Sequence, residues 1–208
     1  MGLLFTDVDT AASHEYTVLR KVSLDAPFGS VTGFYGRGND GQLEALRVAS
    51  GLIPIRAGSV TLDAIDISKE KPDSRRVRLI FWNQTHADGQ TVRQAMEAVK
   101  EVSANENTSL LTKVGLADKD NADVFSLSAE DRFMLHVAKM LLDSPQALLF
   151  EESFRLFSRP VTFRLIRRLK RLVKQVDCAF VYASSDIETM RAFADTYYVF
   201  DKGMVGGP

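Results

Sequence analysis

The second half of the chain alternates between patterns typical of buried strands and of amphipathic helices. The run QALLFEES, residues 146–153, is short and apolar and ends in two acids, as a strand inside a parallel sheet does. Helical patterns flank it at 126–145 and 163–175, and a strand at 178–185, a helix at 186–195 and closing strands at 196–205 follow. This alternation predicts an α/β sheet.

The first half begins with short strand patterns and ends in helical ones. We expect strands within 2–10, 16–27, 29–36, 58–67 and 77–84, with a helix at 40–52 between the third and the fourth. Beyond Thr91 the period becomes helical at 91–102 and 109–116, and the polar residues 103–109 read as the joint between these two helices. We therefore expect one domain over 1–208, with a helical subdomain at approximately 91–145 inserted in the α/β core.

Composition indicates a packed protein with no general affinity for nucleic acid. Of the 208 residues 45% are apolar and 25% charged, and the net charge is -1. The single cysteine, Cys178, lies among apolar neighbours and reads as a small core residue in a reducing compartment. No signal peptide or membrane span is visible, so we expect a cytoplasmic protein, with peripheral docking at the inner face of the membrane left open.

A glycine-rich loop links the third strand to the first helix. Gly36, Gly38 and Gly41 stand in the stretch GRGNDGQL, where a phosphate-binding loop would need backbone N–H groups that point inward. The pattern G-x-x-x-x-G-K-[ST] is incomplete, because Gln42 and Leu43 occupy the lysine and hydroxyl positions. Two readings stay open: a nucleotide site, or a strand-to-helix turn kept for its geometry.

The order of the segments resembles the ATP-binding subunit of ABC transporters over nearly the whole chain. VLRKVSLDAPFGSVTGFYG resembles the strands before the family's phosphate loop, and ASGLIPIRAGSVTLDAIDI resembles the segment after it. SLSAEDRFMLHVAKMLLDSPQALLFEES is similar to the signature helix and the Walker B strand, and VYASSDIETMRAFADTYYVFDKGMV to the switch segment. The resemblance implies a P-loop NTPase-like core with a mixed sheet, an N-terminal antiparallel β portion and a helical subdomain.

The resemblance assigns nucleotide contacts to the glycine loop and to the end of the Walker B strand. The loop positions are Gly36, Arg37, Gly38, Asn39, Gly41, Gln42 and Leu43. Leu43 offers no oxygen to Mg²⁺, and Asp40 adds a negative charge beside the loop. Glu152 falls at the position of the general base, and Glu151 replaces the aspartate that helps to hold Mg²⁺. These adjacent carboxylates repel each other unless a cation lies opposite them.

The remaining family positions also depart from the pattern. The signature L-S-G-G-Q reads Leu127, Ser128, Ala129, Glu130, Asp131, and Glu130 adds bulk and like charge where a glycine approaches phosphate. Ser128 is either a phosphate donor or simply the cap of the following helix. The switch histidine is replaced by Ser185.

Three positions are ambiguous. The lid glutamine, a candidate metal ligand, is Gln84 or is replaced by Trp82, and neither Tyr16 nor His14 clearly fits the adenine-stacking place. The three histidines lack the spacing of metal ligands, and His136 is expected in the core.

Together these departures imply a pseudo-ATPase. ABC ATPases hydrolyse ATP between two subunits, so Gln42 and Leu43 impair one composite site and Glu130 the other. We expect a homo- or heterodimer with an ABC-type ATPase subunit, a membrane transporter partner near Trp82–Gly89, and no nucleic acid. ATP and Mg²⁺ binding stays open. The alternative is a divergent, active transporter ATPase in which Arg37 or Arg47 supplies the missing charge.

The helix pattern at 163–175 is strongly basic. Leu165, Ile166, Leu169, Leu172 and Val173 form the expected buried stripe, and six lysines and arginines lie mostly on the other faces. Such a helix is either a solvated surface packed on the sheet or a contact for acidic lipid headgroups or an acidic partner.

Overall fold

Two β-sheets and a group of helices build the molecule. The computed structural model describes residues 1–12, 17–38, 40–80, 89–100 and 103–206. The first sheet is antiparallel in the order β2-β1-β4-β5. Its strands are β1 (Gly2–Thr10), β2 (Val22–Pro27), β4 (Ile55–Leu62) and β5 (Ile65–Asp66). This sheet is the antiparallel β portion that the resemblance implied.

The second sheet has the order β10-β9-β3-β8-β7-β6 and is parallel except for its edge strand β10. Its strands are β3 (Val31–Tyr35), β6 (Val77–Ile80), β7 (Ala147–Glu151), β8 (Ala179–Ser184), β9 (Thr196–Asp201) and β10 (Met204–Gly206). β7 lies between β6 and β8 and is parallel to both, as its continuous apolar sequence predicted. The mixed α/β core is thereby confirmed.

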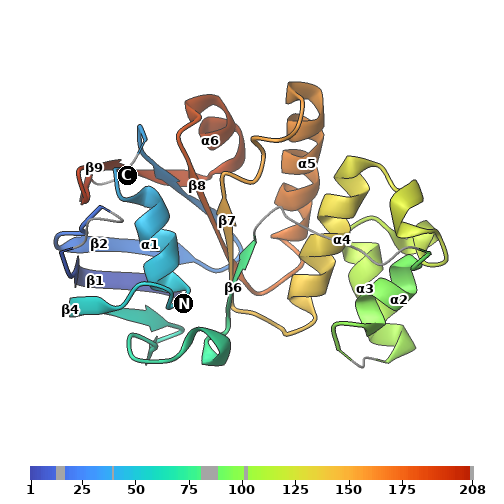
Figure 1. The fold of residues 1–208 in the computed structure, drawn as a ribbon, viewed down its shortest axis with the longest axis horizontal. Coiled ribbons are helices and arrows are strands. Elements are labelled where there is room, and N and C mark those ends of the chain that lie inside the picture. The colour runs from blue at the N-terminus through green and yellow to red at the C-terminus, as the bar shows by residue number, and fades with distance from the viewer. Residues whose placement is uncertain (13–16, 39, 81–88, 101–102, 207–208) are drawn as a thin grey trace.

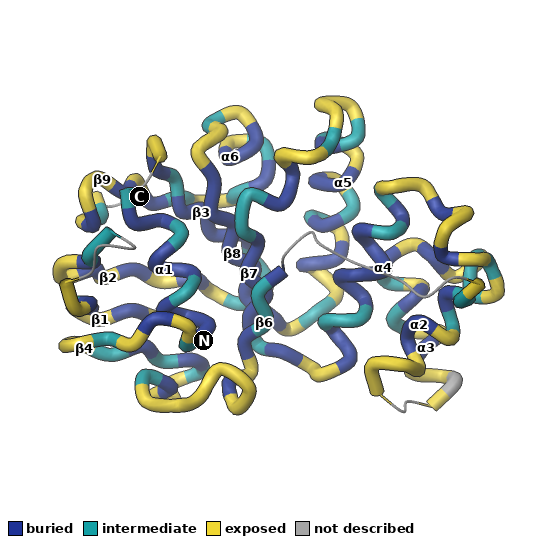
Figure 2. Tube along the Cα trace, in the orientation of Figure 1, coloured by how far each residue is buried: buried dark blue, intermediate teal, exposed yellow. Residues whose placement is uncertain are grey.

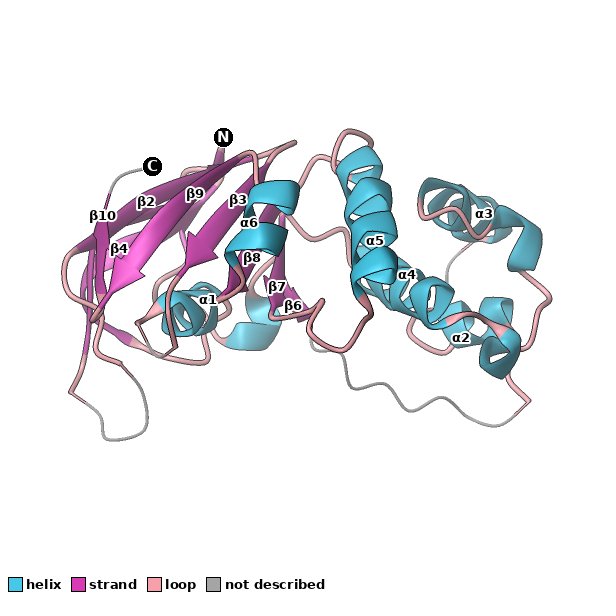
Figure 3. Ribbon diagram, turned by 90° about the horizontal axis from the view of Figure 1, so that it is seen from above, coloured by secondary structure: helices cyan, strands magenta, loops and turns pink. Residues whose placement is uncertain are grey.

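Helices cover both faces of this second sheet (Figure 1). α1 (Gln42–Ala49) packs on the face toward the antiparallel sheet, and α5 (Arg159–Leu172) and α6 (Ile187–Phe193) pack on the other. Beyond α5 lie α4 (Ala129–Leu141), α2 (Val92–Glu97) and α3 (Ala104–Lys113), which Figure 3 shows on the side away from the antiparallel sheet. Short 3₁₀ turns occupy Pro72–Ser74, Ala117–Lys119 and Val124–Ser126.

The alternation of side chains along β7 divides the core in two. Leu149 belongs to the cluster between the two sheets, and its neighbours Leu148 and Phe150 belong to the cluster under α4, α5 and α6. All three are fully buried. The carboxyl end of β7 is therefore held from both faces, with buried residues concentrated in the centre of the molecule (Figure 2).

Several helix boundaries differ from the prediction: α2 ends at Glu97, α5 begins at Arg159, and the start of α3 differs most. Residues 103–109 were expected to form a polar joint, but α3 begins at Ala104 and includes most of them. Ser103 caps this helix by accepting a hydrogen bond from the Glu106 N–H at 3.2 Å, and Asn107 is buried within it. The polar run therefore forms the first turns of a helix that Ser103 caps, and composition alone did not predict this.

Candidate functional site

The glycine loop leaves the carboxyl end of β3 and enters α1, at the edge of the sheet where α/β proteins bind ligands. Gly38 and Gly41 adopt positive φ, +86° and +110°, which non-glycine residues rarely do. Gly41 is the N-cap of α1 and has no side chain to bond the first N–H groups. Gly36 N–H donates to the Ser184 carbonyl at 3.4 Å, which ties the loop to the end of β8.

The side chain of Gln42 lies inside this loop. It is 1% exposed, and its Nε2 donates to the Gly38 carbonyl at 2.7 Å and to the Gly36 carbonyl at 3.4 Å. A Cβ on Gly36 would approach the Gln42 Oε1 to 2.3 Å, so the glycine leaves the room that the amide fills. The loop therefore folds around a neutral side chain of its own, and the interior that would receive phosphate oxygens contains the amide of Gln42.

Asp40 supplies the loop with an internal anion. Its Oδ2 accepts a hydrogen bond from the Arg37 N–H at 2.8 Å. A phosphate-binding loop directs such N–H groups at its ligand. Here the carboxylate takes one of them and places negative charge where a polyphosphate would approach.

Leu43 and its surroundings do not fit a magnesium ion. Leu43 is half-buried and packs against the cluster between the two sheets, and it carries no oxygen that could ligate a hard cation. Within the described residues, no three His, Cys, Asp or Glu side chains gather as a metal site requires. The residues at this loop thus do not fit Mg²⁺ bound in the usual manner of a phosphate loop.

Glu151, at the end of β7, pairs with an arginine of α1. Arg47 Nη2 lies 3.0 Å from Glu151 Oε1, and the other carboxylate oxygen is buried without a hydrogen-bond partner among the described residues. Arg47 is thus a cation that lies opposite one of the two adjacent glutamates, which is the condition under which their repulsion was expected to be offset. Arg47 therefore pairs with Glu151. Arg37 is exposed, and a hydrogen bond with the Tyr35 side chain raises the pKa of its guanidinium.

The structure brings Glu152 and Ser185 together. Ser185 donates to Glu152 Oε1 through both its backbone N–H, at 2.8 Å, and its hydroxyl, at 3.1 Å. Ser184 donates its hydroxyl to Glu152 Oε2 at 3.0 Å. Glu152 also adopts a positive φ of +43°, which is unusual for a residue with a side chain. Both oxygens of the candidate general base are thus bound by the chain itself.

Sequence reasoning missed Ser184. It lies next to Ser185, is fully buried at the end of β8, and also accepts a hydrogen bond from the Asp186 N–H at 3.1 Å. Its position at the carboxyl end of a parallel strand was a usable signal, because that edge faces the loops that follow β3 and β7.

A cleft of about 340 Å³ opens beside Glu152, on the side toward α5 and α6. Its lining includes Ser184, Ser185, Arg155 and Arg159, and Tyr182 closes one wall. Burial raises the pKa of Tyr182 to about 12, so its hydroxyl stays protonated at neutral pH. None of the described residues of the glycine loop lines this cleft. The cleft beside Glu152 is therefore separate from the loop, although Gly36 and Glu152 both bond Ser184.

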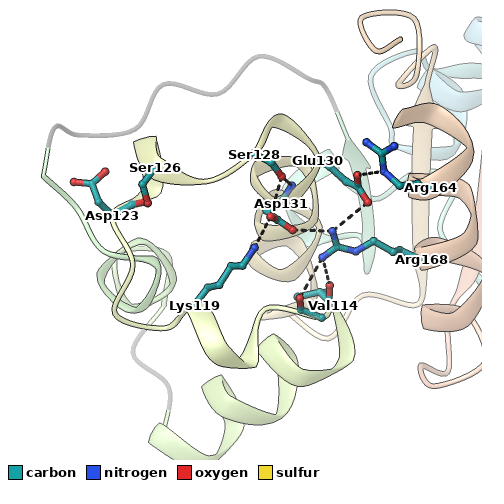
Figure 4. A network of polar contacts seen from close by, with 10 residues as sticks. Val114, Lys119, Asp123, Ser126, Ser128, Glu130, Asp131, Arg164 and Arg168 are labelled. Atoms are coloured by element: carbon teal, nitrogen blue, oxygen red, sulfur yellow. Dashed lines mark hydrogen bonds and ion pairs between the residues drawn. The ribbon is translucent and has the colours of Figure 1, made fainter. Parts of the chain in front are cut away.

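The signature positions form a helix cap and an ion-pair network (Figure 4). Ser128 Oγ accepts a hydrogen bond from the Asp131 N–H at 3.1 Å and donates to Asp131 Oδ2 at 2.8 Å, which confirms its role as the N-cap of α4. Leu127 is buried in the core and Ala129 is exposed. The geometry thus accounts for Ser128 without any phosphate.

Two acids of this segment contact arginines of α5. Glu130 lies 2.8 Å from Arg164 and 3.4 Å from Arg168, and Asp131 lies 2.8 Å from Arg168 and 2.6 Å from Lys119. Burial by itself raises the pKa of the Asp131 carboxyl, but the hydrogen bonds from Lys119, Arg168 and Ser128 lower it below its ordinary value overall. Two guanidinium groups thus lie beside the negative charge that Glu130 adds at this position.

Several predicted positions lie outside the described residues. These are the lid candidates Gln84 and Trp82, the adenine-stacking candidates His14 and Tyr16, the loop residue Asn39, and most of the expected transporter contact at 82–89. His136 is buried in the core, as predicted. No helix of the described part has the length and apolar character needed to cross a membrane.

Comparisons with known proteins agree with this architecture. Residues 19–155 match the family described as ABC transporter. A methionine import ATP-binding protein MetN of Rhodopseudomonas palustris is 25% identical, with 93% of this chain and 56% of the relative covered. A second, MetN 2 of Burkholderia mallei, is 26% identical over 90% of this chain and 50% of the relative. The chain thus spans about half the length of the curated relatives it matches.

Solved structures share the fold. The protein cbiO1 from Clostridium perfringens, described as part of the ABC transporter complex cbiONQ, has a TM-score of 0.84 at 18% identity, covering 99% of this chain and 86% of that one. The ADP conformation of MJ1267, an ATP-binding cassette of an ABC transporter, has a TM-score of 0.83 at 15% identity, covering 99% and 89%. At these identities the likeness extends to the fold alone.

Proposed function

Because this chain belongs to the ABC transporter family, we propose that it is an ATP-binding-subunit-like protein that docks onto a transporter or partner subunit without efficient ATP hydrolysis. The observation that carries this proposal is the buried Gln42 amide, which bonds the carbonyls of Gly36 and Gly38 inside the phosphate loop. A neutral amide there contributes no charge to a triphosphate. The lost charge-assisted contact is worth about 1.5–3 kcal/mol of binding.

The second support is the state of the catalytic carboxylates. Glu152 accepts three hydrogen bonds from Ser184 and Ser185, and Glu151 pairs with Arg47. A general base must have a free lone pair directed at the attacking water. In this chain serine donors take three of the roughly four lone-pair directions of the Glu152 carboxylate, and only Oε2 keeps one for a water.

The third support concerns a dimer. In the family, ATP lies between the phosphate loop of one subunit and the signature of another. Gln42 and Leu43 weaken the site on this chain's loop, and Glu130, pinned between two arginines, replaces a glycine in the site on a partner's loop. Pairing with an intact subunit would therefore leave both composite sites altered.

The proposed partners are a second ABC-type ATPase subunit, alike or different, and a membrane transporter subunit at the inner face of the membrane. The support is the family and the curated relatives, which are named as methionine import ATP-binding proteins. We do not extend methionine to this chain, because it spans only about half of each relative and is about one quarter identical.

ATP turnover by the purified chain tests the proposal. We expect phosphate release in ATP and Mg²⁺ to equal that of Glu152→Gln prepared in parallel, because Gln42 and Leu43 supply neither the charge nor the metal-ligating oxygen that turnover needs. The matched comparison removes the contribution of contaminating ATPases. Turnover that Glu152→Gln abolishes would refute the proposal.

A divergent, active ATPase is the second candidate, favoured by the exposed guanidinium of Arg37 within the loop. It requires Mg²⁺-dependent ATP binding that is lost in Arg37→Ala. Calorimetry with ATP and Mg²⁺ on the two proteins distinguishes the candidates: under our proposal the Arg37→Ala variant and the unmodified chain give the same weak or absent heat.

A further inference from the structure

The exposed side of α5 carries a concentration of positive charge, although the net charge of the chain is -1. Five cations and one acid line a groove of about 530 Å³ along it: Arg164, Arg167, Arg168, Lys170, Arg171 and Glu130. We call these five cations the α5 basic face. The helix beneath them is anchored, because Leu165, Ile166, Leu169 and Leu172 on its opposite side are buried. The guanidinium groups thus project from a fixed scaffold.

Two arginines of the α5 basic face pair with no acid among the described residues. Arg164 and Arg168 share Glu130, Arg168 also contacts Asp131, and Lys170 lies 3.3 Å from Asp195. The side chains of Arg167 and Arg171 are exposed and form no ion pair or hydrogen bond with any described residue. They are four residues apart, one helical turn or about 6 Å along the axis.

The positive surface continues past α5 toward α3. A smaller hollow of about 170 Å³ is lined by Arg168 and Arg171 of the basic face together with Lys113 and Gln175. The two hollows share Arg168 and Arg171, so positive side chains line adjacent surface from α5 to the end of α3. A ligand that follows it must present several negative charges in a row.

We propose that the α5 basic face binds an acidic polypeptide segment of a partner protein, whose carboxylates pair with Arg167 and Arg171. Arginine predominates over lysine on this face, and its planar fork suits the two oxygens of a carboxylate. The surface is a groove, which receives a chain better than a flat bilayer. Its lining contains only charged residues, so it has no apolar or aromatic side chain to insert among lipid tails.

Binding of a short helical peptide with glutamates one turn apart tests this proposal, with the same peptide carrying glutamines as the probe control. We expect the full chain to bind the glutamate peptide at low salt, and Arg167→Gln/Arg171→Gln to weaken it by about tenfold or more. The matched variant Arg20→Gln/Arg56→Gln removes the same charge from exposed positions elsewhere. It should bind like the unmodified chain.

The readouts distinguish this interaction from non-specific attraction and from lipid. No binding of the glutamate peptide, or equal losses in the two double variants, would overturn the proposal. So would cosedimentation with phosphatidylserine vesicles that requires Arg167 and Arg171 while peptide binding does not. Far-UV circular dichroism of both variants confirms that the fold is retained, which the exposure of all four side chains leads us to expect.

Discussion

At the scale of single residues, the glycine loop shows how one side chain changes what a backbone can bind. In the loop of Gly36, Gly38 and Gly41, the Gln42 amide bonds two backbone carbonyls and the Asp40 carboxylate accepts a hydrogen bond from one backbone N–H. Two side chains of the loop itself therefore engage several of its backbone groups.

Introducing the lysine and the hydroxyl of the phosphate-loop pattern tests whether their absence limits ATP binding. We expect Gln42→Lys/Leu43→Thr to bind ATP with Mg²⁺ at least about tenfold more tightly than the unmodified chain, because an ammonium and a hydroxyl contribute charge-assisted contacts of about 1.5–3 kcal/mol. Calorimetry measures the change. Gln42→Leu/Leu43→Thr is the control, with the hydroxyl but without the charge, and equal affinities of the two variants would show that the lysine position does not limit binding.

At the scale of elements, the start of α4 forms a joint between helices. Asp131 at the start of α4 bonds Arg168 of α5, and Arg168 in turn donates to the Val114 carbonyl after α3 at 2.8 Å. These contacts connect three helices through a few largely buried side chains. Glu130 and Asp131 thus hold α4 against α5.

The charge on Asp131 gives this joint a pH dependence. Its pKa is lowered in the folded chain, so the stabilisation is complete above the ordinary value of about 3.9 and is lost as the pH falls through the lower folded value. At pH 7 we expect Asp131→Asn to lower the free energy of unfolding by about 1–3 kcal/mol, because charged partners lose their hydrogen bonds.

Urea unfolding at a series of pH values measures this difference, which should shrink below about pH 4. Asp118→Asn, at an exposed position, provides the control and should change little at any pH. A difference that stays constant to the lowest pH would mean that the charge of Asp131 contributes nothing to the joint.

At the scale of the whole molecule, one apolar cluster joins the helices to the sheet. It contains Val92 of α2, Leu111 of α3 and Phe133 of α4 together with Phe150 and Phe180 of the sheet. Such continuity predicts that residues 91–145, although they project to one side (Figure 1), unfold together with the α/β core.

Cys178 provides the probe for this prediction. It is 1% exposed immediately before β8, and burial raises the pKa of its thiol to about 12, so the folded chain should not react with iodoacetamide at pH 8. We expect labelling of Cys178 and loss of helical circular dichroism to follow one transition in urea. Helix loss at lower urea than labelling would identify the helical part as a separate unit.

The sequence by itself determined the order of strands and helices, the buried stripe of α5, the cap at Ser128 and the core positions of Cys178 and His136. These follow from periodicity and local hydrogen bonding, which act between near neighbours in the chain. Only the tertiary structure decided that Glu152 is held by Ser184 and Ser185, that Arg47 faces Glu151 and that Glu130 is neutralised by α5. Those partners are distant in sequence, and electrostatic pairing depends on which strand ends and helix faces the fold brings within a few ångströms.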